Sequence, residues 1–179
     1  MNKVIILDRD GVINRDSMHY IKSPDEFVLL PGSALAIARL NTAGYRVGVA
    51  TNQSGISRGF YDVVQLGAIH EKMRALVQQA GGFIDIIEYC PHMPDTGCTC
   101  RKPEPGMLLA IATCFKCSLI DVPFVGDRVS DIQAAIAVGA KPIMVLSQMT
   151  DQIGLAGYPD VPVFTSLSDY VDKFLASNE

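Results

Sequence analysis

The sequence predicts an α/β protein built on a doubly wound parallel sheet. Short apolar runs alternate along the chain with segments of helical periodicity, and this alternation is typical of parallel sheets with helices on both faces. Polar residues directly follow several of the apolar runs, among them Asp8, Asp10, Thr51 and Asp127. Because ligands bind beyond the carboxyl ends of the strands in such sheets, these residues are the first candidates for a functional site.

The individual elements are predicted from local patterns. Residues 4–7 are continuously apolar and predict a strand that is buried on both faces. Pro31 and Gly32 precede a helical pattern that ends near Gly44, and Asp62 with Gln65 predicts a capping box at the start of a longer helix. The expected strands span residues 4–7, 46–51, 83–89, 122–125, 142–146 and 161–164. The expected helices span residues 33–40, 107–115 and 131–138, and two more begin at residue 62 and near residue 167.

Length and composition indicate one globular domain that comprises residues 1–179. Hydrophobic residues make up 49% of the chain and charged residues 19%, which excludes a disordered protein. The net charge of -4 argues against a general nucleic-acid binder. No apolar run approaches the ~20 residues that a membrane span needs. Because the chain begins with a strand rather than a leader, we expect a cytoplasmic protein.

Carboxylates stand at the ends of two predicted strands. If the extended path continues beyond residue 7, Asp8 and Asp10 share one side of the chain and Arg9 points away. A helix cap would explain one of these acids, but not two directly after a buried strand. Asp127 and Asp131 follow another strand and share a helix face. Since Mg²⁺ favours carboxylate and water ligands, we expect a magnesium site in which Asp131 is structural rather than a direct ligand.

Two further strand-end or loop motifs are suited to phosphate. Thr51 and Asn52 offer a hydroxyl, an amide and free backbone N–H groups, although an ordinary turn explains them equally well. Arg101 and Lys102 precede a predicted helix. Three aspartates and a phosphate dianion together carry a charge of about -5, so a nearby lysine would be useful beside Mg²⁺.

A loop at residues 90–100 has the composition of a metal site. It contains three of the five cysteines and one of the three histidines, together with prolines and glycine that leave almost nothing apolar to bury. Three cysteines and a histidine form a closed tetrahedral set that is typical of structural rather than catalytic Zn²⁺. A turn-rich loop without a metal is the alternative interpretation. The predicted zinc ligands are Cys90, His92, Cys98 and Cys100.

The remaining cysteines and His70 are expected to have no catalytic or metal-binding role. Cys114 and Cys117 lie one helical turn apart and are expected to pack within a helix. His70 is expected on an exposed helix face without a function. The segment after Thr150 contains no motif that predicts a role.

The four motifs DRDG, TNQSG, RKPEPG and GDRVSD occur in this order at predicted strand ends or just before a helix. In this arrangement the sequence resembles the haloacid dehalogenase superfamily of aspartyl-phosphate phosphatases between residue 3 and about residue 146. Within that superfamily it is most similar to the heptose bisphosphate phosphatase family, which is related to histidinol-phosphate phosphatases. The resemblance implies a Rossmann-like domain that has no large cap domain and carries the zinc loop instead.

The resemblance also implies residue roles. Asp8 would be the nucleophile and Asp10 the general acid and base, and Mg²⁺ would be held by the Asp8 carboxylate, the Asp10 backbone carbonyl and Asp127. Thr51 and Lys102 would bind the transferring phosphoryl group, and Arg101 would assist catalysis. The implied substrate-binding residues are Asp16, Ser17, Met18, His19, Thr51, Asn52, Gln53, Ser54, Arg101, Lys102 and Arg128. Arg128 departs from the lysine or small polar residue that the pattern leads us to expect.

The implied function is removal of the C7 phosphate from D-glycero-D-manno-heptose 1,7-bisphosphate, by a monomeric enzyme of nucleotide-heptose synthesis for lipopolysaccharide or another glycan. A histidinol-phosphate phosphatase is the alternative within the same chemistry. A phospho-acceptor signalling module would need its acceptor aspartate after the third strand, where Cys90 stands. A zinc-stapled nucleic-acid module fits poorly with the acidic charge balance. A phosphatase assay with and without Mg²⁺ separates the enzymes from the other two classes.

Overall fold

The computed structural model describes residues 3–177, and strands alternate with helices along most of the chain. The strands are β1 (Val4–Leu7), β2 (Arg46–Asn52), β3 (Ile86–Cys90), β4 (Pro123–Gly126), β5 (Lys141–Val145) and β6 (Val163–Phe164). The helices are η1 (Pro24–Glu26), α1 (Ser33–Thr42), α2 (Val63–Gln79), α3 (Gly106–Phe115), α4 (Val129–Ala137), α5 (Gln152–Leu155) and α6 (Leu167–Ala176).

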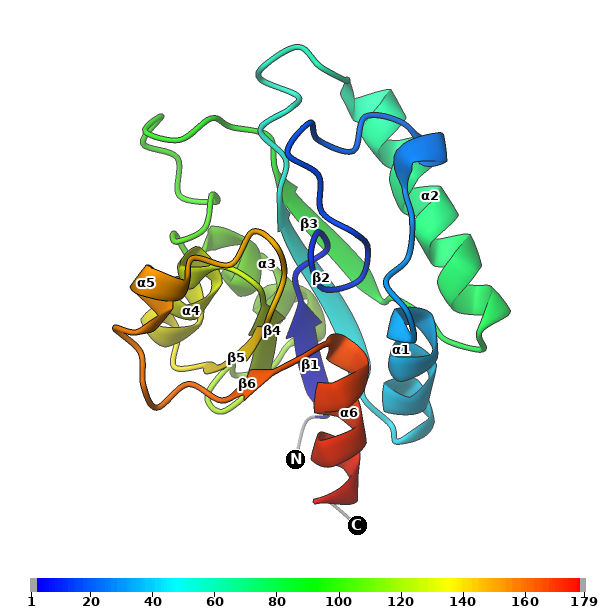
Figure 1. The fold of residues 1–179 in the computed structure, drawn as a ribbon, viewed down its shortest axis with the longest axis vertical. Coiled ribbons are helices and arrows are strands. Elements are labelled where there is room, and N and C mark those ends of the chain that lie inside the picture. The colour runs from blue at the N-terminus through cyan, green and yellow to red at the C-terminus, as the bar shows by residue number, and fades with distance from the viewer. Residues whose placement is uncertain (1–2, 178–179) are drawn as a thin grey trace.

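The six strands form one parallel sheet in the order β3-β2-β1-β4-β5-β6, which confirms the predicted fold class (Figure 1). β1 occupies a central place, with β2 on one side and β4 on the other. The chain winds outward from β1 to β3 and then crosses to β4 on the other side. This reversal opens a crevice between the carboxyl ends of β1 and β4, where ligands bind in doubly wound sheets.

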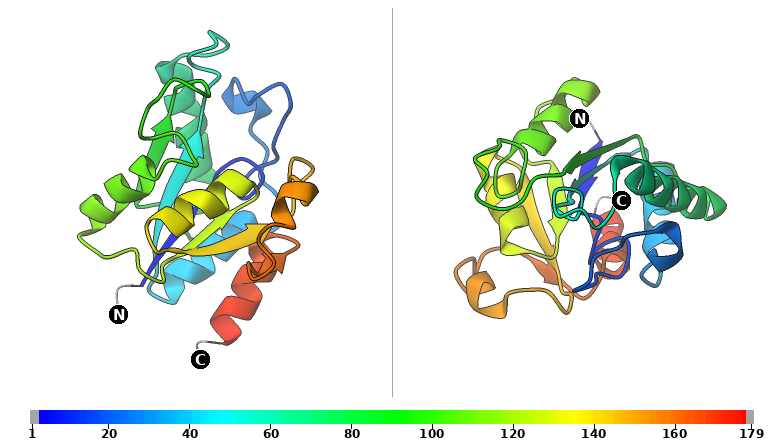
Figure 2. Two further views of the ribbon diagram at one scale, coloured as in Figure 1. Left: turned by 90° about the vertical axis from the view of Figure 1, so that its left-hand side faces the viewer. Right: turned by 90° about the horizontal axis from the view of Figure 1, so that it is seen from above.

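Helices cover both faces of the sheet (Figures 1 and 2). One apolar cluster joins Ile5 and Leu7 of β1 to residues of α1, α2 and α6, and the other joins Val4 and Ile6 to residues of α3 and α4. Since successive side chains of a strand point to opposite faces, the alternation explains why all four residues of β1 are buried.

The third strand differs from its prediction over residues 83–89. It begins at Ile86. The backbone N–H of Asp85 still donates a 2.9 Å hydrogen bond to the Val47 carbonyl, but the N–H of Val47 donates to the side chain of Asp85, with 2.8 Å to Oδ2, instead of to a backbone carbonyl of the third strand. Phe83, predicted inside the strand, is exposed and donates its backbone N–H to the Asn41 side chain. The predicted capping box of α2 is confirmed. α5 was not predicted.

The segment between β1 and β2 contains a loop, η1 and α1. η1 is fixed to α2 by the Lys72 ammonium group, which donates a 2.6 Å hydrogen bond to the Pro24 carbonyl. Within residues 3–177, no helix combines the length and the apolar character that crossing a bilayer requires.

Candidate active site

Three carboxylates from two strand ends converge at the predicted crevice. Asp8 follows β1, Asp127 follows β4, and Asp131 lies in the first turn of α4. All three are buried, and one oxygen of each lies within 4.8 Å of the others. The backbone N–H of Asp8 donates a 2.8 Å hydrogen bond to the Val125 carbonyl, which extends the pairing of β1 with β4 up to the acids.

Two glycines make this approach possible. A Cβ atom at Gly11, whose φ is +81°, would lie 2.1 Å from Oδ2 of Asp127. A Cβ atom at Gly126 would lie 2.3 Å from Cβ of Asp131. Such distances are well inside van der Waals contact, so any larger residue at either position would displace a carboxylate.

Lys102 is the cation of this group. Its buried Nζ lies 3.0 Å from Oδ1 of Asp8 and 2.7 Å from Oδ1 of Asp131, and it donates to the Ala50 carbonyl. The Asn52 side chain holds the Lys102 backbone on both sides, donating to its carbonyl and accepting from its N–H. Asn52 therefore fixes the lysine.

Burial and charge oppose each other in setting these protonation states. Burial would lower the pKa of Lys102, but Asp131 and Asp8 raise it above its usual value. Burial raises the pKa of Asp8 well above its usual value, although Lys102 lowers it. Burial and the neighbouring Asp131 raise the pKa of Asp127 to about 7. A site that crowds carboxylates in this way favours a further cation.

The donor set fits Mg²⁺. Oδ1 of Asp127 is buried and has no hydrogen-bond partner among the residues that the structure describes, whereas its Oδ2 accepts a 2.6 Å bond from the Ser147 hydroxyl. An unpartnered buried carboxylate oxygen is costly. Since the group offers oxygen atoms only, a hard divalent cation matches it. Asp131 also takes structural contacts, because its Oδ2 accepts backbone N–H groups from Asp127 and Arg128.

Asp10 lies beside the group in a different environment. Its Oδ1 accepts hydrogen bonds from the Arg9 guanidinium and from Asn14, and its Oδ2 accepts one from Gln53. Burial alone would raise the pKa of Asp10, but Arg9 and these hydrogen bonds lower it below its usual value. Asp8 and Asp10 are thus neighbours with opposite pKa shifts.

Two predictions about neighbouring residues are wrong. Arg9 does not point away from the aspartates: its side chain is fully buried and its NH2 group lies 2.9 Å from Oδ1 of Asp10. His70 does not lie on an exposed helix face: it is buried, and its Nε2 lies 3.1 Å from NH1 of Arg9. The guanidinium group of Arg9 turns back to the carboxylate of Asp10 inside the protein. The alternation of side chains along an extended backbone therefore does not determine the direction of this long side chain.

A cleft of about 480 Å³ opens above the carboxylates. The predicted site residues that line it are Asp8, Asp10, Asp16, Ser17, Met18, Asn52, Gln53, Ser54, Arg101, Lys102 and Arg128. Asp131, expected as a structural residue of the site, lines it too, and so do residues that the sequence did not indicate, namely Tyr20, Ile21, Pro94, Pro103, Ser130 and Met149. Thr51 is buried and accepts a hydrogen bond from Gln53. His19 is exposed and is not among the lining residues.

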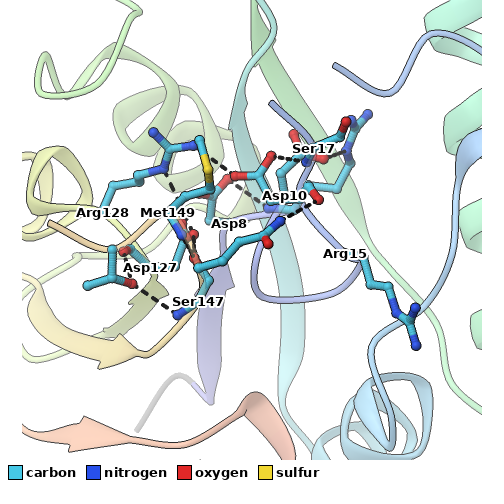
Figure 3. Close-up of polar contacts among 12 residues, drawn as sticks. Asp8, Asp10, Arg15, Ser17, Asp127, Arg128, Ser147 and Met149 are labelled. Atoms are coloured by element: carbon cyan, nitrogen blue, oxygen red, sulfur yellow. Dashed lines mark hydrogen bonds and ion pairs between the residues drawn. The ribbon is translucent and has the colours of Figure 1, made fainter. Parts of the chain in front are cut away.

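The rim joins segments that are far apart in the sequence (Figure 3). NH2 of Arg128 lies 2.8 Å from Oδ2 of Asp16, and Nε of Arg128 lies 3.9 Å from Oδ2 of Asp127. Met149 lines the same cleft, and Figure 3 shows Arg15 pointing away from the group. Arg128 is therefore held at the mouth of the cleft by a carboxylate that a ligand could replace.

The four predicted zinc ligands are brought together. One ligand atom from each of Cys90, His92, Cys98 and Cys100 lies within 4.8 Å of the others, a geometry compatible with Zn²⁺. Burial raises the pKa of the Cys90 thiol to about 12, so only a bound cation would hold it as a thiolate. Despite some burial, the Arg101 N–H and the Thr96 hydroxyl lower the pKa of Cys98 to about 6.

This cluster contacts the cleft directly. NH1 of Arg101 donates a 3.2 Å hydrogen bond to the backbone carbonyl of His92, and Pro94 of the same loop lines the cleft. Arg101 and Lys102 follow Cys100 without a break. The conformation of the loop thus determines where Arg101 lies.

Comparison with known proteins agrees with this geometry. A model of the HAD-hydrolase-like family matches residues 99–170. D-glycero-beta-D-manno-heptose-1,7-bisphosphate 7-phosphatase from Pseudomonas putida is 53% identical over 158 residues, which cover 88% of this chain and 90% of the relative. The chain belongs to the heptose-bisphosphate phosphatase family of haloacid dehalogenase-like proteins. The family member with the same name from Neisseria meningitidis is 44% identical over 98% of this chain and 96% of its own length.

A solved structure of the heptose-bisphosphate phosphatase family has the same fold. The D,D-heptose 1,7-bisphosphate phosphatase from Bordetella bronchiseptica, complexed with magnesium and phosphate, superposes with a TM-score of 0.91. It is 47% identical and matches 98% of this chain and 99% of its own.

Proposed function

We propose that this protein is a Mg²⁺-dependent phosphatase that removes the C7 phosphate of D-glycero-D-manno-heptose 1,7-bisphosphate. The observation that carries the proposal is the buried Lys102 between Asp8 and Asp131, beside the unpartnered oxygen of Asp127. The names of the family relatives and the magnesium and phosphate in the Bordetella structure support it. They favour heptose bisphosphate over the histidinol-phosphate alternative. Since the Pseudomonas and Neisseria relatives are named for the β-anomer, we propose the same anomer here.

Asp8 would act as the nucleophile. Its Oδ1 accepts a 2.7 Å hydrogen bond from the Arg9 N–H and lies 3.0 Å from Lys102, which leaves Oδ2 as the attacking oxygen. The Oδ2–phosphorus bond forms as the bond from phosphorus to the sugar oxygen breaks, giving an aspartyl-phosphate. The carboxylates of Asp8 and Asp127 and the backbone carbonyl of Asp10 would hold Mg²⁺, which supplies positive charge that favours ionised Asp8 and stabilises the transferring phosphoryl group.

Asp10 would donate a proton to the leaving sugar oxygen and then accept one from the hydrolytic water. Its lowered pKa leaves it ionised before substrate binds. A phosphate dianion placed beside it raises that pKa and allows it to carry the proton. Thr51 and Lys102 would bind the equatorial oxygens of the phosphoryl group, where charge spreads in the transition state.

The second phosphate of the substrate would bind at the rim. Arg101 and Arg128 both line the cleft, and arginine binds phosphate with a planar fork. Arg128 would exchange Asp16 for this phosphate. Asp16 to His19 and Asn52 to Ser54 would contact the sugar, and His19, which is exposed beside the cleft lining, would do so at its outer edge.

The test of the proposed substrate compares kcat/KM for the bisphosphate and the matching monophosphate. Wild type is expected to prefer the bisphosphate, and Arg128→Ala should lose about 10-fold or more of that preference, because a charge-assisted hydrogen bond contributes ~1.5–3 kcal/mol. Arg15→Ala is the matched control, since that side chain points away from the site (Figure 3). Equal use of both esters by wild type would contradict recognition of a second phosphate and favour histidinol phosphate.

We also propose that Cys90, His92, Cys98 and Cys100 bind a structural Zn²⁺ that orders the loop carrying Arg101. Purified protein prepared without chelator is expected to contain about one zinc per chain. Cys98→Ser should lower both zinc content and activity, because Arg101 loses its fixed place against the His92 carbonyl.

Elemental analysis with kinetics on the same preparation provides the measurement. Cys114→Ser is the matched control, because Cys114 is exposed and lies outside the cluster. Wild-type protein that contains no metal at this loop would contradict the proposal, as would a Cys98→Ser variant that keeps full zinc content.

Three further proposals complete this function. Residues 1–179 act as one domain, a proposal supported by two apolar clusters that share β1. The protein works as a monomer on a small sugar bisphosphate, with no nucleic acid or membrane as partner. It works in the cytoplasm on the route to nucleotide-heptose for lipopolysaccharide or another glycan, and its five cysteines are free, as a reducing compartment would keep them.

A further inference from the structure

The carboxyl group of Asp10 is held by an unusual number of donors. Its Oδ1 accepts from Nε of Arg9 at 3.2 Å, from NH2 of Arg9 at 2.9 Å and from Nδ2 of Asn14 at 2.9 Å. Within residues 3–177, its Oδ2 accepts from Nε2 of Gln53 alone, at 3.0 Å. Three donors fill the accepting positions of Oδ1. A proton on Asp10 is therefore carried by Oδ2.

Two buried side chains outside the cleft hold the donors in place. His70, from α2, places its Nε2 3.1 Å from NH1 of Arg9. Tyr61, from the loop before α2, places its hydroxyl 2.5 Å from Oε1 of Gln53. His70 is 7% exposed and Tyr61 4%, and neither is among the residues that line the cleft.

The chemistry of the partners fixes the direction of each hydrogen bond. A guanidinium group only donates, so Nε2 of His70 must be the acceptor and the ring must be neutral with its proton on Nδ1. An amide oxygen only accepts, so the Tyr61 hydroxyl donates to Gln53. With its oxygen engaged, Gln53 must turn its NH₂ group toward Asp10 and toward Oγ1 of Thr51, which lies 2.9 Å away.

The surroundings maintain these directions. Burial, together with the charge of Arg9, lowers the pKa of His70 to about 3, so the ring stays an acceptor at neutral pH. Gly55 makes room for Tyr61, because a Cβ atom there would lie 2.2 Å from the Tyr61 ring.

We propose that His70 and Tyr61 are positioning residues for proton transfer: they hold Arg9 and Gln53 so that Oδ2 of Asp10 carries the catalytic proton into the cleft. This inference rests on the proposed phosphatase function. As the phosphorus–oxygen bond to the sugar breaks and the bond to Asp8 forms, the Oδ2–H bond breaks and its proton passes to the sugar oxygen. The resulting Asp10 carboxylate is stabilised by Arg9.

The experiment compares two esters that differ in their need for this proton. When the phosphoryl group is transferred to Asp8, the sugar bisphosphate releases an alkoxide, which needs a proton, whereas p-nitrophenyl phosphate releases a stable phenolate, which does not. The measured quantity is kcat/KM of each variant relative to wild type for each ester, because kcat/KM reports the steps up to and including phosphoryl transfer to Asp8. Since general acid catalysis contributes ~10²–10⁴-fold in full, loosening the acid in His70→Leu or Tyr61→Phe is expected to cost about 10-fold on the bisphosphate and less than about 2-fold on the nitrophenyl ester. His70→Gln keeps an acceptor for Arg9 and should restore most of the activity.

The controls separate positioning from folding. Tyr158→Phe removes a hydroxyl that bonds Gln133 away from the site and should change neither ester. Tyr61→Phe deletes a single oxygen and keeps the inference testable if His70→Leu does not fold. The His70→Gln comparison needs only the bisphosphate, so it stands even if the nitrophenyl ester is a poor substrate.

The outcomes are distinct. Equal losses on both esters, no loss on either, or failure of His70→Gln to recover activity relative to a folded His70→Leu would overturn the positioning role. A wild-type protein that hydrolyses neither ester would instead overturn the proposed function.

Discussion

Asp8→Asn is expected to reduce hydrolysis of the sugar bisphosphate to the background rate, because an amide oxygen cannot attack phosphorus to form an aspartyl-phosphate. The substitution preserves shape and keeps an acceptor for Lys102 and for the Arg9 N–H. Steady-state phosphate release measures the effect. Asp10→Asn is expected to lose a smaller factor of ~10²–10⁴, since it removes proton transfer and leaves the nucleophile in place.

Asp8→Asn also has an expected effect on stability. Burial raises the pKa of Asp8 well above its usual value, which means that the folded protein disfavours the ionised carboxylate. Asp8→Asn should therefore unfold no more easily than wild type in the absence of Mg²⁺, as judged by chemical denaturation. A variant that is folded and retains near-normal turnover would exclude the aspartyl-phosphate mechanism.

Lys102→Met is expected to lower both stability and activity strongly. Lys102 is the buried cation between Asp8 and Asp131, and removing one partner of a buried ion pair costs ~3–5 kcal/mol, because the remaining charge is left uncompensated. Activity should fall further than stability explains, since the phosphoryl group loses its lysine. Denaturant titration measures the loss in free energy of unfolding, and steady-state phosphate release measures the loss of activity.

The pH dependence of that loss has a definite sign. The carboxylates left by Lys102→Met relieve their repulsion by taking up protons, so the stability difference from wild type should be smaller at pH 5 than at pH 8. Lys141→Met, at an exposed position, is the matched control and should be near neutral. A Lys102→Met protein as stable as wild type at pH 8 would show that the buried charges are solvated in some other way.

Much of the fold was predictable because its signals are local. The four residues of β1 are continuously apolar and lie between two helical layers. The capping box at Asp62 requires only two side chains three residues apart. The acids at the ends of β1 and β4 were found because parallel strands present their carboxyl ends at one edge of the sheet.

The side-chain contacts of Arg9 and His70 were not predictable from the sequence. Arg9 was expected to point away because its backbone position alternates with Asp8 and Asp10, but a long side chain can turn back to a nearby carboxylate. His70 had a usable signal: it lies four residues after Leu66 and three before Met73, so helical periodicity places it with the buried face of α2. A polar residue at such a position needs a buried partner, and the sequence does not show which one.

The strand order has a consequence for synthesis of the chain. β1 precedes the other strands of this sheet in the chain, yet one of its two edges is covered by β4, which follows three strands later. A nascent or truncated chain that ends before Pro123 therefore presents β1 with unpaired N–H and C=O groups, which are a template for pairing with other chains. Asp127 also lies beyond β4, so the proposed magnesium site is complete only once that edge is closed. We therefore expect the chain to be open to aggregation and without activity over the same interval of its synthesis, until β4 has formed.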